Sequence, residues 1–178
     1  MLSTERLIIR GWTVEDAPAA LAMLSRIEVV KWLGDGEPVL TKDLDEAREK
    51  IARWQGRDHP PLGHWAVQVT DGGDLHGRVI GSVLLLTLPN SKHGEVEIGW
   101  HLHPDAWGRG YAPEAARAVL RRGFEGGLPE IHAVTHLDNE NSMRVATKIG
   151  MTHTGIVHTW YEEPSQHFVL RREEWHAS

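Results

Sequence analysis

The feature that most constrains the fold is the passage from a strand, through a glycine-bearing loop, into an amphipathic helix at residues 96–124. The strand pattern is broken by Pro104, and the loop has the sequence DAWGRG. From Tyr111 onward the apolar residues recur at the helical period, and the arginines fall on the opposite face. The order strand, loop, helix therefore indicates an α/β chain in which one face of this helix is buried.

The rest of the chain continues this alternation. We expect strands at 6–12, 64–69, 78–88, 95–103, 131–137, 154–160 and 167–171, and helices at 13–26, 41–54, 111–124 and 141–149. A hairpin-rich first half followed by strand, helix, strand, helix, strand predicts a mixed, mostly antiparallel α/β sheet flanked by helices. We find no repeat, low-complexity tract or Gly/Ser linker, so residues 1–178 are expected to form a single domain.

Composition excludes several classes of protein. With 0 Cys, neither a disulfide nor a cysteine nucleophile can occur. The net charge of −6, without any Lys/Arg block longer than two, argues against a nucleic-acid partner and is compatible with a cationic amine. The longest apolar run, 79–88, is too short and too interrupted to cross a bilayer, and the N-terminus lacks a signal-peptide pattern. We therefore expect a cytoplasmic location.

The loop before the helix predicts an anion site. Gly108 and Gly110 allow the backbone N–H groups to turn inward, and the start of a helix adds unpaired donors and partial positive charge. A pyrophosphate would suit this site, and Arg109 would either add a charge contact or lie in solvent. Pro113 stands where a Rossmann fingerprint needs its third glycine, which disfavours a dinucleotide-dependent oxidoreductase.

Two ordered motifs carry a resemblance to the GNAT superfamily of N-acyltransferases. WGRGYA at 107–112 resembles the coenzyme A pyrophosphate loop, and NENSMRVATKIGM at 139–151 resembles the second motif of the superfamily. Trp107 and Met151 depart from the usual residues at their positions. The first and last segments resemble the branch that contains ribosomal-protein alanine N-acetyltransferases.

The resemblance implies a GNAT-like fold and acetyl-CoA as the acyl donor. In the superfamily the strand before the loop is bulged, and it pairs with the pantetheine of coenzyme A. The residues that would bind the coenzyme are Trp100, His101, Leu102, Trp107, Gly108, Arg109, Gly110, Tyr111, Ala112, Asn139 and Ser142. One backbone N–H of the strand, at His101, would bind the acyl oxygen.

The chemistry also needs a base and an acid. Glu97 lies four residues before His101 on the same strand face, so we expect it to deprotonate the amine; the alternative is a solvated glutamate. Ala146 stands where many members have the acidic tyrosine, so Ser142 is the candidate acid. Helix capping by Ser142 or Asn141 is the alternative for that segment. Trp32 and Tyr161 are candidates for the acceptor site.

Several alternatives stay open at this stage. The acceptor would be a protein N-terminus or a small amine, and the donor could be another short acyl-CoA such as succinyl-CoA. A non-catalytic acyl-CoA-binding or regulatory domain would keep the same loop. His101 with His103, and His132 with His136, have spacings that metals accept, but 12 His make chance pairs common, so we expect no metal. A homodimer is compatible with the resemblance.

Overall fold

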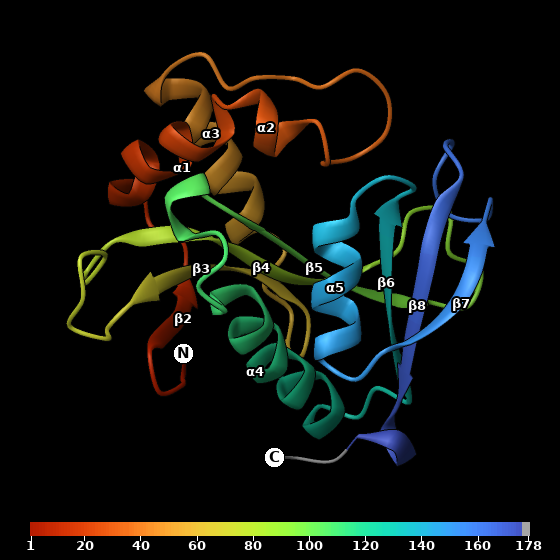
Figure 1. Ribbon diagram of the computed structural model, residues 1–178. Helices are drawn as coiled ribbons and strands as arrows, with labels where there is room; N and C mark the ends of the chain where they lie inside the picture. Colours follow the sequence, from red (N-terminus) through yellow and green to blue (C-terminus); the bar gives the residue numbers. More distant parts are fainter. Residues whose placement is uncertain (176–178) are drawn as a thin grey trace.

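The computed structural model describes residues 1–175, which form an eight-stranded sheet with helices packed on it (Figure 1). The strands lie in the order β1-β2-β3-β4-β5-β6-β8-β7. Their bounds are β1 Leu2–Ser3, β2 Leu7–Gly11, β3 Gly63–Val69, β4 Val79–Thr87, β5 Val96–Leu102, β6 Glu130–His136, β7 Thr152–Val157 and β8 Ser165–Arg171. The helices are α1 Ala17–Leu24, α2 Ile27–Val30, α3 Leu44–Gln55, α4 Tyr111–Glu125 and α5 Glu140–Lys148. No helix among residues 1–175 is long and apolar enough to cross a membrane.

The sheet confirms the predicted mixed, mostly antiparallel fold class, and it opens at one place. Neighbouring strands are antiparallel except β5 and β6, which run parallel and share one registered pair, Glu97 with His132. Strands β4 and β5 pair from Gly81↔Leu102 to Thr87↔Val96 without a register shift. The expected bulge is therefore absent from this pairing. The edge of β5 is instead left open because its second half no longer pairs with β6.

Local sequence explains where the helices begin. Asp43 caps α3 by accepting a hydrogen bond from the Glu46 N–H (2.9 Å), so the helix starts two to three residues after the expected Thr41. Helix α1 begins at Ala17 with Pro18 in its first turn, where a missing N–H is tolerated. Helix α4 begins after Gly110, whose φ of +81° is a left-handed conformation that favours glycine.

Three elements differ from the sequence-based expectation. The four-residue helix α2 and the two-residue strand β1 were not expected, because segments this short carry no readable period. Strand β7 lies at Thr152–Val157 rather than 154–160, and its pairing with β8 shifts register near Gly155, which has a φ of +109°. The remaining strands and helices lie within a few residues of their expected positions.

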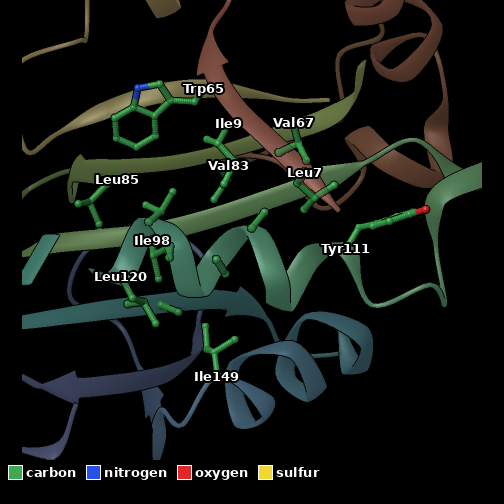
Figure 2. Close-up of a cluster of buried hydrophobic side chains, with 14 of the residues drawn as sticks. Leu7, Ile9, Trp65, Val67, Val83, Leu85, Ile98, Tyr111, Leu120 and Ile149 are labelled. Carbon is green, nitrogen blue, oxygen red and sulfur yellow. The ribbon is translucent and has the colours of Figure 1, made fainter. Parts of the chain in front are cut away.

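Two apolar clusters cover opposite faces of the sheet. Neighbouring residues of β3 point to opposite faces, and Ala66 belongs to one cluster while Val67 belongs to the other. The larger cluster packs α4 and α5 on the sheet, and Figure 2 shows Val83 and Ile98 of the sheet in the same cluster as Leu120 of α4. The smaller cluster packs α1, α2 and α3 on the other face. The sheet is therefore held between two separately packed layers of helices.

Candidate active site

A cavity of about 780 Å³ lies where β5 and β6 separate. One wall comes from the DAWGRG loop and the first turns of α4 and α5, and the opposite wall comes from α2 and α3. Among the sequence-predicted site residues, those that line it are Trp32, Glu97, Trp100, His101, Leu102, Trp107, Gly108, Gly110, Tyr111, Ala112, Asn139, Ser142 and Tyr161. The structure therefore brings segments from four distant parts of the chain to one cavity.

Arg109 is the predicted site residue that does not line the cavity. Its guanidinium is bound by both carboxylate oxygens of Asp74, at 2.6 and 3.0 Å, in the turn between β3 and β4. Neither expectation for the Arg109 side chain, a charge contact with the ligand or simple solvation, describes this ion pair. The arginine instead ties the loop to the hairpin and leaves the glycine backbone facing the cavity.

The loop is built to present backbone donors. Gly108 and Gly110 have φ values of +74° and +81°, and helix α4 starts directly after them. The N–H groups of the first helical turn have no partner within a helix, and the helix dipole places partial positive charge there. The Trp107 indole Nε1 donates to the Leu102 carbonyl oxygen (2.8 Å), which fixes the loop against the end of β5. This end of the cavity suits a phosphate-bearing ligand.

Glu97 lies on the floor of the cavity, where β5 and β6 part. Burial raises the pKa of its carboxyl group to about 7, and a hydrogen bond donated by the Tyr161 hydroxyl to Oε1 (2.7 Å) partly offsets that rise. Burial, followed by the nearby Glu97 charge, raises the pKa of Tyr161, so this phenol stays protonated at neutral pH. A carboxyl group that titrates near neutrality beside a substrate-sized cavity can act as a general base.

Two histidines line the same cavity as Glu97, and sequence reasoning missed the first of them. His64 of β3 is 5% exposed, and its Nε2 lies 3.0 Å from the Ser82 Oγ. Its ring is in edge contact with His101, at 6.0 Å between centroids. Burial lowers the pKa of both imidazoles, that of His101 to about 4, so both are neutral at pH 7. The period-two pattern of β3 already placed His64 opposite the apolar Trp65, Val67 and Val69 face.

The second motif places Asn139 and Ser142 at the start of α5. The Asn139 Oδ1 accepts from the Ser142 N–H (3.2 Å), so Asn139 is the capping residue, rather than Ser142 or Asn141 as the alternative expected. Ala146 is fully buried in the apolar core. The Ser142 side chain borders the cavity, so the serine is the hydroxyl that this motif offers to a ligand.

The acceptor-side candidates lie on the opposite wall. Trp32 follows α2 and meets His136 of β6 edge-on, at 6.0 Å between ring centroids. The Lys31 ammonium lies 4.5 Å from the Trp32 ring centroid. Tyr161 enters from the segment between β7 and β8 through its contact with Glu97.

One histidine of each pair with metal-like spacing is hydrogen-bonded within the fold, whereas the Nε2 of the buried His101 has no hydrogen-bond partner among residues 1–175. His103 accepts a hydrogen bond from the Asp105 N–H (3.2 Å), and His132 Nδ1 lies 2.9 Å from His167 Nε2. In the described part of the chain, no group of three or more His, Asp or Glu is arranged to hold a metal ion.

The geometry defines one cavity that is lined by a glycine-bearing loop at the start of α4, by a carboxyl group with a raised pKa and by side chains of α3. A family model described as "Acetyltransferase (GNAT) domain" matches residues 6–152. The chain therefore belongs to the GNAT family of acetyltransferases. This confirms the predicted family and the prediction that the chain is an acetyltransferase.

Similar proteins agree with this assignment. YoaA of Bacillus subtilis strain 168, described as an uncharacterized N-acetyltransferase, is 31% identical over 159 residues, which are 88% of this chain and 85% of YoaA. A GNAT-family acetyltransferase from Bacillus anthracis has a TM-score of 0.77 at 26% identity, covering 97% of this chain and 98% of that one. RimJ of Mycobacterium smegmatis, solved with CoA-disulfide, has a TM-score of 0.76 at 16% identity, covering 97% and 85%, and shares the fold.

Proposed function

We propose that the chain transfers an acetyl group from acetyl-CoA directly to a primary amine, with both substrates bound at once and Glu97 as the general base. The observation that carries this proposal is that Glu97, a carboxyl group with a pKa of about 7, lines the same cavity as the glycine-bearing loop of 107–112. The chain has 0 Cys and can form no acyl-cysteine intermediate, and the family resemblance favours a ternary complex in which the amine attacks the thioester directly.

In this proposal the donor lies along the open edge of β5. The backbone N–H groups of 108–112 bind the pyrophosphate, with Trp107 closing the loop beside them. The backbone of Trp100, His101 and Leu102 binds the pantetheine, and the N–H of His101 stabilises the oxyanion that forms when the amine attacks the thioester carbonyl. The Asn139 amide bonds the coenzyme near the thiol end. The CoA-bound RimJ of Mycobacterium smegmatis, which has the same fold, supports a donor in this cleft.

The proton steps use two side chains. Glu97 removes a proton from the ammonium group, directly or through one water, so that the neutral amine attacks the thioester carbonyl. When the carbon–sulfur bond breaks, the Ser142 hydroxyl gives a proton to the thiolate. The products are coenzyme A and an N-acetylated amine. Trp32 and Tyr161 border the acceptor, and Tyr161 holds the Glu97 carboxyl in place.

The test is thiol release from acetyl-CoA and from succinyl-CoA over a panel of peptides with free N-termini and small amines. With the best acceptor, Glu97→Gln is expected to lower kcat/KM at pH 7 by about 100-fold or more, because general base catalysis contributes about that much. Ser142→Ala is expected to lower kcat by about tenfold or more for the same reason. Calorimetric affinity for coenzyme A should change by less than about twofold in either variant, since neither side chain contacts the phosphates.

Each outcome has a defined meaning. Equal losses of turnover and of coenzyme affinity in Glu97→Gln would contradict its role as base, and unchanged turnover in Ser142→Ala would remove the acid assignment. Coenzyme A binding without thiol release over the whole amine panel would overturn amine acetylation. Faster release from succinyl-CoA than from acetyl-CoA would reassign the donor.

A further inference from the structure

The acceptor wall of the cavity carries a row of cationic side chains. Lys50 and Arg53 of α3 and Arg57 of the turn after it line the cavity together with Trp54. Their spacing of three and four residues places them on one helical face, and the Arg57 N–H continues that turn by bonding to the Trp54 carbonyl oxygen (3.1 Å). The row therefore lies along one side of the cavity and also reaches solvent, since the Arg53 side chain is 58% exposed and Arg57 is exposed.

Few anions balance this row. The Lys50 ammonium lies 3.7 Å from Glu46, and the Arg53 guanidinium lies 4.0 Å from Glu49, whose side chains lie one turn back along α3. Within residues 1–175, Arg57 makes no ion pair.

The acidic residues of the cavity do not neutralise the row either. Within residues 1–175 they are Glu28 and Glu97. Glu28 faces Arg26 at 3.5 Å, and burial keeps much of Glu97 protonated near pH 7. The pocket is therefore locally positive although the whole chain has a net charge of −6.

A buried polar atom beside this row lacks a partner. His64 is 5% exposed and lines the same cavity, and its Nδ1 makes no hydrogen bond to any described residue. The imidazole stacks on Trp54, at 4.4 Å between centroids, and the positive charge of Arg57 helps to keep it neutral. Buried polar groups are normally hydrogen-bonded, so this enclosed nitrogen is an unsatisfied polar atom in the wall beside the row.

We propose that the acceptor is a small amine that also carries an anionic group, a carboxylate or a phosphate, which Arg57 and Arg53 bind while the amine faces Glu97. This inference rests on the proposed amine acetylation and narrows its substrate class. Arginine binds carboxylate and phosphate through paired N–H donors, so one unpaired guanidinium and its neighbour supply a matched site. The same charges repel a polycationic amine, which reverses the expectation drawn from the net charge alone.

The experiment compares acceptors that differ only in the anion. One pair is an α-amino acid and its carboxamide, and the second pair is phosphoethanolamine and ethanolamine, which separates the phosphate source from the carboxylate source. Because amine basicity differs within a pair, the informative quantity is the change in the ratio of kcat/KM values between wild type and variant. Arg57→Gln is expected to reduce that ratio about tenfold, mainly through KM, and Arg53→Gln combined with it should reduce the ratio further.

The matched control is Arg48→Gln. Arg48 lies on the same helix, has an ion pair with Asp45 at 2.6 Å and does not line the cavity. Arg48→Gln removes one positive charge, as Arg57→Gln does. If the ratio of kcat/KM values falls equally in both variants, the effect comes from the general electrostatic field, and a direct contact between Arg57 and the anion is contradicted. A ratio unchanged in both Arg57→Gln and the double variant would also overturn it.

A binding readout separates this inference from the proposed reaction. In the presence of coenzyme A, the N-acetylated amino acid should bind the wild type at least about tenfold more tightly than its N-acetylated carboxamide, and Arg57→Gln should abolish the difference. If the two compounds bind with this difference but no amine is acetylated, the proposed reaction is contradicted and the anion site stands. If amines are acetylated but the two compounds bind equally well, the anion site is contradicted and the proposed reaction stands.

Discussion

Two glutamates at the start of β5, Glu95 just before the strand and Glu97 within it, have opposite electrostatic surroundings. The carboxyl group of Glu97 is buried, which raises its pKa from 4.5 to about 7. Glu95 accepts hydrogen bonds from the Ser91 hydroxyl and the His93 N–H, and these contacts lower its pKa from 4.5 to about 2. The two side chains therefore make stability depend on pH in opposite senses.

The folded state binds the Glu97 proton more tightly than the unfolded state, so its contribution to stability is lost as the pH rises from about 4.5 to about 7. Glu97→Gln removes that loss. We expect the free energy of unfolding of the variant, relative to wild type, to increase by at most about 3 kcal/mol between pH 4 and pH 8. Urea denaturation at the two pH values measures this difference, and it needs no substrate.

Glu95→Gln provides the control with the opposite sign. The lowered pKa of Glu95 means that its contribution is present above pH 4.5 and is lost as the pH falls toward about 2. This variant should be less stable than wild type at pH 7, with the difference shrinking in acid. If the stability difference between Glu97→Gln and wild type changes with pH in the same direction as that of Glu95→Gln, the raised pKa of Glu97 is contradicted.

The residues of the site differ in how far sequence could predict them. Glu97 and Ser142 follow from strand alternation and a motif, and both line the cavity as expected. Arg57 and His64 carry no motif, because they meet the cavity only when α3 packs across β3. The ion pair of Arg109 could not be predicted from local sequence because its partner Asp74 lies 35 residues away in the β3–β4 turn. Local patterns thus predict one wall of the cavity, and long-range packing determines the other.

At the scale of elements, the start of α4 depends on a backbone conformation that other residues avoid. Gly110 has a φ of +81°, and an added Cβ would lie 3.4 Å from the Arg6 guanidinium. Gly110→Ala is expected to reduce stability by about 1–2 kcal/mol, the cost of a left-handed conformation in an L-residue. It should also weaken coenzyme A binding about tenfold or more, because the strained turn displaces N–H donors that bind phosphate. Calorimetry and thermal denaturation measure the two effects.

Gly94→Ala is the matched control for this substitution. Gly94 has a φ of +79°, with no atom within 4 Å of an added Cβ, and it lies in the β4–β5 turn and does not line the cavity. It should show a similar loss of stability with unchanged coenzyme affinity. Equal losses of affinity in both variants would mean that the start of α4 has no special part in binding.

Sequence predicted the long elements better than the short ones. Helices α3 and α4 have full turns of periodic apolar residues. The sequence therefore predicted both helices, and only the positions of their ends differ from the prediction. Helix α2 has four residues, fewer than two turns, and is held by Val29 and Val30 packing against α1 and α3. Its formation depends on tertiary contacts and not on a local pattern.

At the scale of the whole molecule, the two clusters on opposite faces of the sheet support opposite ends of the cleft. The cluster that contains Leu120 positions α4 and α5, which border the proposed donor end. The cluster that contains Ile51 positions α3, which carries the cationic row of the proposed acceptor end. Both side chains are at most 1% exposed, so truncating either one leaves a cavity in a packed core.

This division makes the functional effect of a core variant depend on which face it lies on. Ile51→Ala and Leu120→Ala are each expected to lower the free energy of unfolding by about 2–5 kcal/mol. At a temperature where both variants stay folded, Ile51→Ala should raise the acceptor KM more than the coenzyme A dissociation constant, because α3 packs less closely on the sheet. Leu120→Ala should do the reverse, because α4 shifts under the phosphate loop. Steady-state kinetics gives the acceptor KM of the two variants, and calorimetry gives their coenzyme A dissociation constants. If both quantities rise in parallel in both variants, the two faces of the sheet do not act separately on the two substrates.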